Sequence, residues 1–509
     1  MHLKFFLLKD PEKPSMLQSI CLSLAAFSAP PYTPDWASLD SRPMPGWFAA
    51  AKFGIKMHWG MYSVPSYNDF NPHRQDAAQY WRFNQAAPGC PKAQQPNCKG
   101  FPYGKMGANN SVRAFHQRAF PGITTYDEFK PMFTAPLFNA TAWAELFAAS
   151  GARYMRPVVK FGDGWTHWSS NTTGNWSSPH GGPRRDIVGE LFTAARAFNL
   201  RTGVHFELSE WLDPETLKKV LPAWRADALS SVNPVKYRDT VVWTQLTQLV
   251  EKYQPDDIYT DSEWDWSSDW WRSRDWLAWL FNDSPVRDHV IVNDRWGNET
   301  RGKHGGYFVC EYAACTGPNE HGHAWTKTLS INSRFGYNRH DRAPELRNAS
   351  FLIKELMHSA SQGGNLDLSV DAMGDGRIDP YHEAVLLEIG GWLRANGEAV
   401  YNTRIAPQRQ NFTTTTGTLF FFTAAAAVAD GTKTLFATAT TWPGASFSLP
   451  LDGRPCPPTD SVSLLGDASV TITAICKGDE LAIAVGTPPM GCLDGGAAMR
   501  NAWSFRVAW

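Results

Sequence analysis

A repeated alternation of short apolar strands, polar loops and amphipathic helices runs from about residue 50 to about residue 400. Such alternation is typical of parallel βα units, and so many units in a row favour a closed (β/α)8 TIM-like barrel over an open sheet. The pattern becomes less regular after Cys310. The expected strands are 53–57, 154–161, 202–207, 257–260, 289–293 and 365–370, and the expected helices are 138–150, 186–198, 239–253, 275–281, 351–361 and 382–395.

The composition changes after Tyr401, where short Thr- and Val-rich segments separated by turns replace the alternation. These segments predict a C-terminal antiparallel β-sandwich. A chain of 509 residues has room for such a domain beside a barrel. We therefore expect a barrel at 30–400, with a long loop insert at 66–125 that is rich in Asn, Gln, Pro and Gly, and a sandwich at 401–509.

Residues 1–29 have the features of a secretory signal region. The apolar run at 17–29 ends in small residues, and cleavage after Ser28 would suit them. The lysine-flanked stretch before Met16 is an unusual n-region, so translation begins either at Met1 or at Met16. The run is too short to span a bilayer, and no stretch of about 18 apolar residues occurs anywhere, so no membrane span is expected.

The cysteines and the glycosylation sequons agree with a secretory route. The eight cysteines show no CxxC spacing and no paired-His pattern, which argues against a zinc site. One thiol is left over if Cys21 is removed with the signal region. The local disulfide candidates are Cys90 with Cys98, Cys310 with Cys315, and Cys456 with either Cys476 or Cys492. The sequons lie at Asn109, Asn139, Asn171, Asn175, Asn298, Asn348 and Asn411.

The charge is nearly balanced, with 48 Lys+Arg against 49 Asp+Glu and no charged run. This balance argues against nucleic acid or a strongly anionic membrane surface as the main partner. The chain contains 23 tryptophans. Many tryptophans serve core packing, but their flat apolar faces also suit the rings of sugars, so the excess is compatible with carbohydrate binding.

The stretch 253–266, YQPDDIYTDSEWDW, concentrates carboxylates and indoles at a predicted strand end. The strand 257–260 delivers Asp261 at its C-terminal end, and Glu263 and further acidic and Trp residues follow. Active sites of barrels are built at the C-terminal ends of the strands. A capped strand end with a solvated acidic loop explains this stretch alone equally well. The polar side chains expected at such ends are His58, Asp163, Glu207, Asp261, Arg295 and Glu311.

Several segments from about Trp47 to Arg404 together resemble the α-L-fucosidases of glycoside hydrolase family 29, of the animal lysosomal type. The segments occur in the family's order and spacing, and the NDRWG, HGGY and CE elements are the most specific. They read WFAAAKFGIKMHWGMYSVP, GPRRDIVGEL, YQPDDIYTDSEW, FNDSPVRDHVIVNDRWGN, HGGYFVCE, GGNLDLSV and GWLRANGEAVYNTR.

The resemblance implies a retaining mechanism through a covalent glycosyl-enzyme, which uses two carboxyl groups about 5–5.5 Å apart. Asp261 matches the nucleophile of the family. Glu311 falls in the acid/base region, where the next residue is Tyr312 and a second family acid, after a His-Lys-Trp, is replaced by Thr326. Glu311 is therefore the expected acid/base, and Glu263 is its nearest competitor. The expected substrate contacts are His58, Trp59, Asp163, Trp165, His205, Glu207, Glu263 and Arg295.

The chain departs from the family in the residues that bind the sugar. The family carries two adjacent histidines at the end of the second strand, where this chain has Phe161 and Gly162. A Gly-Leu-Tyr-His-Ser segment on the next strand is replaced by a segment containing His205 and Glu207, which offer a substitute imidazole and a substitute acceptor. L-Fucose is the favoured sugar, while a related 6-deoxy or galacto-configured sugar stays open because polar pocket groups set such selectivity.

Two non-catalytic alternatives are a lectin-like relative and a structural glycoprotein that retains the barrel. The joint presence of Asp261, Glu311 and Arg295 weighs against both. No metal and no cofactor are expected, because two carboxyl groups suffice for this chemistry. The expected partner is a fucosylated glycan or glycoprotein, homo-oligomerisation stays open, and the expected location is the secretory pathway, either a lysosome or vacuole or the extracellular space.

Overall fold

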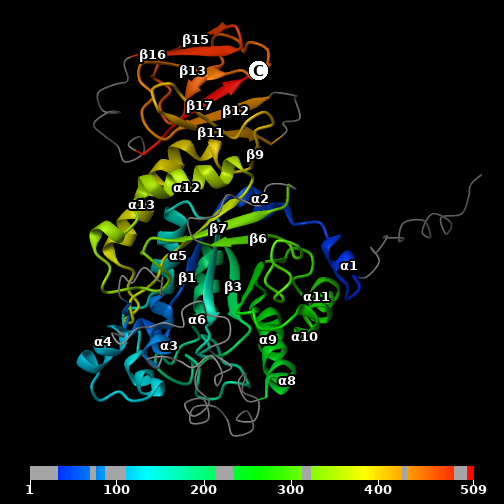
Figure 1. Ribbon diagram of the computed structural model, residues 1–509, viewed down its shortest axis with the longest axis vertical. Coiled ribbons are helices and arrows are strands. Elements are labelled where there is room, and N and C mark those ends of the chain that lie inside the picture. Colours follow the sequence, from blue (N-terminus) through cyan, green and yellow to red (C-terminus); the bar gives the residue numbers. More distant parts are fainter. Residues whose placement is uncertain are drawn as a thin grey trace, which may run out of the picture.

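Eight parallel strands form one curled sheet at the centre of the larger domain (Figure 1). The computed structural model describes residues 32–68, 76–85, 111–211, 233–311, 322–426, 433–486 and 501–509, so the predicted signal region lies outside the described residues. The strand order is β5-β4-β3-β2-β1-β8-β7-β6. The strands are β1 (Phe53–Met57), β2 (Tyr154–Lys160), β3 (Arg201–Glu207), β4 (Asp257–Asp261), β5 (Ile291–Val292), β6 (Phe308–Glu311), β7 (Trp325–Ser330) and β8 (Asn365–Ser369).

The first and last strands of this order approach each other without a strand ladder between them among the described residues. The backbone N–H groups of Gly306 and Tyr307, just before β6, each donate to the carbonyl of Val292 on β5 at 3.1 Å. The sheet thus curls nearly into a full barrel. The predicted fold class is confirmed, including the expected strand β1 at its predicted bounds.

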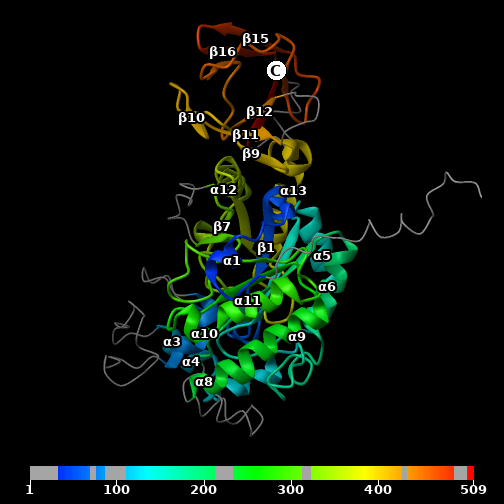
Figure 2. The same ribbon diagram turned by 90° about the vertical axis from the view of Figure 1, so that its right-hand side faces the viewer.

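Helices cover the outside of the barrel (Figures 1 and 2). Several begin at an N-cap whose side chain accepts a backbone N–H, such as Asn139 for α5 and Asp186 for α6, and this satisfies a donor that the helix leaves unpaired. The helices include α1 (Trp36–Asp40), α2 (Gly46–Ala51), α5 (Ala140–Ala149), α6 (Ile187–Ala197), α9 (Trp243–Tyr253), α10 (Ser268–Trp271), α11 (Ser273–Asn282), α12 (Ala349–Ser361) and α13 (Pro380–Asn396). A short α8 (Pro234–Tyr237) and a π-helical turn (Arg238–Val242) precede α9.

The insert at 66–125, which we expected to be a long loop, contains two helices in its described part. They are α3 (Tyr80–Gln85) and α4 (Ser111–Ala119). The hydroxyl of Tyr80 lies 2.8 Å from Nδ1 of His116, which joins the two helices. The N–H of Ala78 also donates to the carbonyl of Phe335 at 3.4 Å, so the insert contacts the loop that follows β7. Aromatic side chains of the insert, such as those of Tyr80 and Trp81, belong to the main hydrophobic core.

A separate β-rich domain follows α13 and contains two antiparallel sheets, as predicted. The first sheet has the order β10-β11-β12-β17-β14 with β9 beside β11, and the second has the order β13-β16-β15. Apolar side chains of both sheets form a common core. The strands are β9 (Thr403–Ile405), β10 (Asn411–Thr413), β11 (Leu419–Ala425), β12 (Thr434–Ala439), β13 (Ser446–Pro450), β14 (Val462–Leu464), β15 (Ile472–Lys477), β16 (Glu480–Val485) and β17 (Trp503–Ala508).

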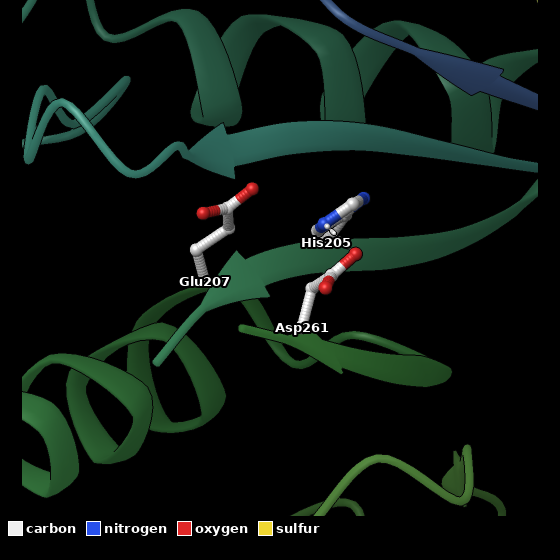
Figure 3. A group of neighbouring side chains, drawn as sticks. All are labelled: His205, Glu207 and Asp261. Carbon is white, nitrogen blue, oxygen red and sulfur yellow. Dashed lines mark ion pairs between the residues drawn. The ribbon is translucent and has the colours of Figure 1, made fainter. Parts of the chain in front are cut away.

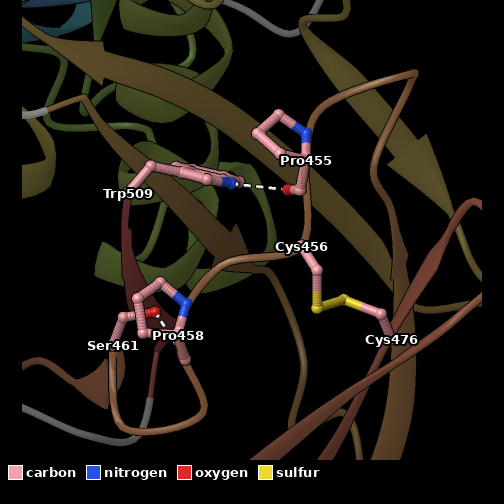
Figure 4. The surroundings of a disulfide bond; sticks show 6 residues. All are labelled: Pro455, Cys456, Pro458, Ser461, Cys476 and Trp509. Atoms are coloured by element: carbon pink, nitrogen blue, oxygen red, sulfur yellow. Dashed lines mark hydrogen bonds between the residues drawn. A yellow bond between two sulfur atoms is a disulfide. The ribbon is translucent and has the colours of Figure 1, made fainter.

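A disulfide links Cys456 to Cys476 on β15, which selects one of the two pairings that we left open for Cys456 (Figure 4). Beside it, the indole N–H of Trp509 donates to the carbonyl of Pro455 at 2.8 Å and so fixes the end of the described chain against the same loop. Cys310 is disulfide-bonded. The other predicted disulfide cysteines, Cys90, Cys98, Cys315 and Cys492, lie outside the described residues.

No helix of the described segments is both long enough and apolar enough to cross a membrane.

Candidate active site

Asp261 is the last residue of β4 and lies at the C-terminal edge of the sheet, where the sequence predicts the site. Its register partner on β3 is Glu207. Because paired residues of parallel strands point to the same face, the two carboxyl groups and the ring of His205 lie together (Figure 3). Nε2 of His205 is 3.5 Å from Oδ2 of Asp261.

The guanidinium group of Arg295 connects three carboxylates. Arg295 follows β5 in the chain and is buried, and its Nη2 donates to Oδ1 of Asp261. Its Nε donates to Oε2 of Glu263 at 3.1 Å, and its Nη1 donates to Oε1 of Glu311 at 3.3 Å. The rigid fork of an arginine suits such multiple recognition. Asp261 on β4 and Glu311 on β6 therefore meet at one side of the barrel mouth, through a shared cation.

Glu263 lies behind this arginine and is itself buried. A second arginine, Arg301, donates to its Oε1 at 2.6 Å. Glu263 is thus occupied by two guanidinium groups, which fits a residue that holds Arg295 in place better than one that contacts a sugar.

Lys56 and Tyr259 complete the floor beneath these groups, and sequence reasoning missed both. Nζ of Lys56 on β1 lies 3.9 Å from Oε1 of Glu311 and 4.3 Å from the ring centre of Tyr259. It has no hydrogen-bond partner among the described residues. The hydroxyl of Tyr259 donates to Oε1 of Glu311 at 3.1 Å. The inward alternation of β1, in which Lys56 lies two residues before His58, is the signal that would have found the lysine.

His58 and His205 form the imidazole part of the site. Nδ1 of His58 lies 3.2 Å from the hydroxyl of Ser369, its ring stacks on Phe335, and its backbone N–H donates to Asp371 at 2.8 Å. The two imidazole rings are 5.6 Å apart. Neither ring nitrogen of His205 makes a hydrogen bond among the described residues, although Nε2 faces Asp261 at 3.5 Å, so Nδ1 is the nitrogen left for a bound molecule.

Burial and neighbouring charges shift the pKa values of Glu207 and Asp261 in opposite directions. Burial, followed by the charge of Asp261, raises the pKa of Glu207 well above its usual range. Burial opposes ionisation of Asp261 as well, but Arg295, His205 and Lys56 together outweigh it and hold the pKa of Asp261 well below the usual range. Burial, reinforced by Lys56, lowers the pKa of His205, so this imidazole is neutral at pH 7. The site therefore pairs a charged with an uncharged carboxyl group.

His205, Glu207 and Asp261 also form a group that could hold a metal ion, because each offers one ligand atom and these atoms lie within 4.8 Å of one another. One imidazole and two carboxylates are a common ligand set for divalent cations. The neighbouring Arg295 and Lys56 already supply positive charge to Asp261, which disfavours a further cation there.

Three of the predicted substrate contacts lie in packing positions. The ring of Trp59 contacts Phe133, Phe138 and other rings of the core. The carboxylate of Asp163 accepts the hydroxyl of Tyr126 at 2.8 Å and the N–H of Trp165 at 3.0 Å. Trp165 itself is buried against Trp176. These contacts join the ends of β1 and β2 to the surrounding loops, so all three side chains contribute to packing.

At the end of β2, Gly162 occupies the position where the resemblance leads us to expect an imidazole. A Cβ atom at Gly162 would lie 1.7 Å from Nε1 of Trp211 and 2.8 Å from Oε2 of Glu207. Real Cβ atoms do not approach so closely, so the indole and the carboxyl group fill this space. Neighbouring Phe161 packs against Trp211 and His58. Phe161, Gly162 and Glu207, at which the sequence departs from the family, thus lie side by side with Trp211 and form one wall of the site.

Comparisons with known proteins agree on one family. Residues 19–398 match the model of the family described as alpha-L-fucosidase. The chain is 38% identical over 378 residues to the tissue alpha-L-fucosidase of Bos taurus, covering 74% of this chain and 72% of that protein. It is 34% identical over 451 residues to the alpha-L-fucosidase of Branchiostoma floridae, covering 88% and 90%.

Among solved structures, the alpha-fucosidase of Thermotoga maritima in complex with a mechanism-based inhibitor is similar with a TM-score of 0.71. The two chains are 27% identical, and the match covers 94% of this chain and 99% of that one.

Proposed function

The chain belongs to the alpha-L-fucosidase family, and on that basis we propose that it hydrolyses terminal α-L-fucosyl residues of glycoconjugates with retention of configuration. The observation that carries this proposal is the shared contact of Arg295 with Asp261 and Glu311 at the C-terminal ends of β4 and β6. Two carboxyl groups facing one substrate position are what a retaining glycosidase requires.

In this proposal, Asp261 is the nucleophile. Arg295 keeps its carboxylate charged and oriented, so that one oxygen can attack the anomeric carbon of the sugar. Glu311, the acid/base that the sequence predicts, contacts the same guanidinium group. It would donate a proton to the departing oxygen and then take one from water.

The proposed sugar contacts are His58, His205 and Glu207. Nδ1 of His205 is buried without a hydrogen bond among the described residues, and Glu207 takes the space beside Gly162. Glu263 orients Arg295. We propose the same sugar as in the named relatives, L-fucose, and keep a related 6-deoxy or galacto-configured sugar as the alternative because this wall differs from the family pattern. The relative named tissue alpha-L-fucosidase supports a route through the secretory pathway to a lysosome or out of the cell, with glycosylation of exposed sequons.

Release of nitrophenol from an aryl α-L-fucoside tests the proposal. We expect turnover by the wild-type protein, and a loss of at least about a thousandfold in Asp261→Asn because the neutral amide cannot attack. Aryl galactosides and other 6-deoxy glycosides in the same panel identify the sugar. Sugar binding without turnover would instead identify a lectin-like protein, and full activity of the variant would refute the assignment of Asp261.

A further inference from the structure

Two tryptophans follow Asp261 in the stretch 253–266 and have no role in the proposed function. We infer that one of them, Trp264, forms an acceptor subsite, in which its indole ring stacks on the pyranose ring of the sugar that leaves with the glycosidic oxygen. This inference rests on the proposed function and specifies its substrate class. The fucosyl residue is attached to another pyranose, and that pyranose contributes to recognition.

The two indole rings have different surroundings. The ring of Trp266 stacks on Trp270 at 4.3 Å and is T-shaped to Trp271 at 5.3 Å, so it packs against α10. Trp264 is 43% exposed, which is unusual for a large apolar side chain among the described residues. Packing therefore explains Trp266, whereas a large part of Trp264 is accessible to a ligand.

Trp264 lies against the cation that joins the two catalytic carboxyl groups. The guanidinium carbon of Arg295 is 5.8 Å from the centre of the Trp264 ring, within the range of a cation–π contact. The same guanidinium group donates to Asp261 and, at 3.3 Å, to Glu311. The ring is therefore next to the place where the glycosidic bond has to lie. This position distinguishes it from an apolar side chain exposed at random on a protein surface.

The leaving sugar belongs at the outer end of the site. In the proposed reaction, Glu311 gives its proton to the glycosidic oxygen, so the sugar bonded to that oxygen is close to Glu311. The side chain of Glu311 is 20% exposed and that of Asp261 is 11% exposed, whereas that of His205 is 1% exposed. The fucosyl ring therefore lies inward, toward His205, and the leaving sugar lies outward, on the side of the accessible indole of Trp264.

The backbone on both sides of Trp264 is fixed. The preceding residue, Glu263, is buried and accepts hydrogen bonds from both Arg295 and Arg301. After it, the N–H of Trp266 donates to the carbonyl of Glu263 at 3.4 Å and closes a turn around Trp264. A large ring on a fixed backbone loses little conformational entropy when a ligand binds, which favours its use as a stacking platform.

A pyranose is the ligand that suits this ring. One face of a pyranose presents C–H groups, and the face of an indole carries the negative part of its quadrupole, so the two faces attract each other and exclude water. The hydroxyl groups at the rim of the sugar stay in contact with solvent at such an exposed position. A serine hydroxyl that carries fucose offers no such face. The subsite therefore favours fucose linked to a sugar over fucose linked to an amino-acid side chain.

Substrates that differ only in the leaving group test this inference. In Trp264→Ala, we expect kcat/KM for a fucosyl disaccharide to fall about 10-fold more than kcat/KM for α-L-fucosyl fluoride, whose leaving group has no ring. Trp264→Phe retains an aromatic face, so the difference between the two substrates should be smaller, about 3-fold. Turnover of the fluoride also shows that each variant is folded.

Phe351→Ala is the matched control. Phe351 is an aromatic residue of α12 that is 38% exposed, and its ring centre lies 5.9 Å from the guanidinium carbon of Arg347. It thus resembles Trp264 in exposure and in its arginine neighbour, but that arginine is not Arg295. The ratio of the two kcat/KM values in Phe351→Ala should equal that of the wild type.

Transfer to an added pyranoside is a second measurement, which does not involve the leaving group. In the second step, a hydroxyl of the pyranoside replaces water. Its oxygen bonds to the anomeric carbon, its proton passes to the Glu311 carboxylate, and the bond to Asp261 breaks. At a fixed concentration of the pyranoside, the ratio of transfer to hydrolysis should fall about 10-fold in Trp264→Ala.

Equal losses with the disaccharide and the fluoride would mean that Trp264 acts on the fucosyl ring or on Arg295, and this result would overturn the subsite. Wild-type kinetics of Trp264→Ala with both substrates would overturn it as well. In either case, loss of fluoride turnover in Asp261→Asn would still support the proposed function. If the wild-type protein releases fucose from neither substrate, the proposed function and the subsite both fail.

Discussion

At the scale of single residues, Arg295 has the most specific geometry of the site, because one planar group contacts three carboxylates. A lysine at this position is a point charge that reaches fewer of them. We expect Arg295→Lys to lower kcat/KM for an aryl fucoside by about 10²- to 10³-fold, mainly through kcat. Arg301→Lys is the control, since Arg301 contacts Glu263 from a half-exposed position and should keep nearly full activity. Equal losses in the two variants would contradict this role.

Lys56 is a second residue whose substitution separates stability from activity. Its amino group is buried without a hydrogen bond among the described residues, and burial lowers its pKa. Glu311 retains Arg295 and Tyr259 when the lysine is removed. We therefore expect Lys56→Met to increase the free energy of unfolding by about 1 kcal/mol, while activity falls because Asp261 loses a favourable charge.

Lys327→Met is the comparison variant, and chemical denaturation measures the stability of both. The amino group of Lys327 on β7 donates a hydrogen bond to Glu355 at 2.5 Å. Its loss leaves a partly buried carboxylate without its cation and should destabilise the protein. A decrease in stability of both variants would show that the amino group of Lys56 is well accommodated.

At the scale of elements, the strands and helices that sequence reasoning identified are those with a regular apolar period. The helices α5, α12 and α13 and the strand β8 formed within a few residues of their predicted bounds. Strand β7 was missed because it reads Trp-Thr-Lys-Thr-Leu-Ser, although all of it is buried. The interior of this barrel holds charged and hydroxyl groups such as those of Arg156, Asp367 and Tyr154, so a polar strand is not a surface strand here.

The same difference in predictability applies to the site. The position of Asp261 follows from a local pattern, a short buried strand before an acidic and aromatic loop. The destinations of Trp59 and Trp165 depend on how distant loops fold back, which no local pattern encodes. The role of Gly162 depends on Trp211 and Glu207, which lie 49 and 45 residues further along the chain.

Helix α12 offers a prediction that separates capping from glycosylation. Oδ1 of Asn348 accepts the N–H of Phe351 at 2.9 Å, and Asn348 is also a sequon. Protein made without glycosylation should lose about 1 kcal/mol of stability in Asn348→Ala, because the cap is gone. Asn348→Asp retains an acceptor and should lose little. Thermal unfolding of both variants measures this, and an equal loss would show that the cap contributes nothing.

At the scale of the whole molecule, the sandwich lies at the end of the barrel next to α12 and α13 (Figure 1). The N–H of Asn402 donates to the carbonyl of Ala50, just before the N-terminal end of β1, and the indole of Trp392 on α13 donates to Ala502 at 3.0 Å. The strand ends that carry Asp261 and Glu207 point the other way. This placement assigns the sandwich to support of the barrel and leaves the mouth to the insert and the loops.

The free energy of unfolding of the barrel should depend on pH because of its buried acidic groups, and Asp163 is the clearest case. Burial raises its pKa from 3.8 to about 7, against the hydrogen bonds from Tyr126 and Trp165. Between these two values the unfolded chain has released a proton that the folded chain still holds. The contribution of Asp163 to stability therefore falls as pH rises from about 4 to about 7 and is constant above that.

Asp163→Asn removes this contribution, because the amide stays neutral at every pH and resembles the protonated acid. Relative to wild type, the variant should gain free energy of unfolding between pH 4 and pH 8, on the order of 4 kcal/mol for the full shift. Asp371→Asn is the control of opposite sign. Burial alone would raise the pKa of Asp371, but hydrogen bonding to His58 and Ser369 lowers it. The free energy of unfolding of the wild type should therefore increase relative to that of Asp371→Asn as the pH rises from the acid range. Urea denaturation across this range measures both differences. A pH-independent difference for Asp163→Asn would mean that the carboxyl group is already charged in the folded barrel, with Lys160 as a compensating cation.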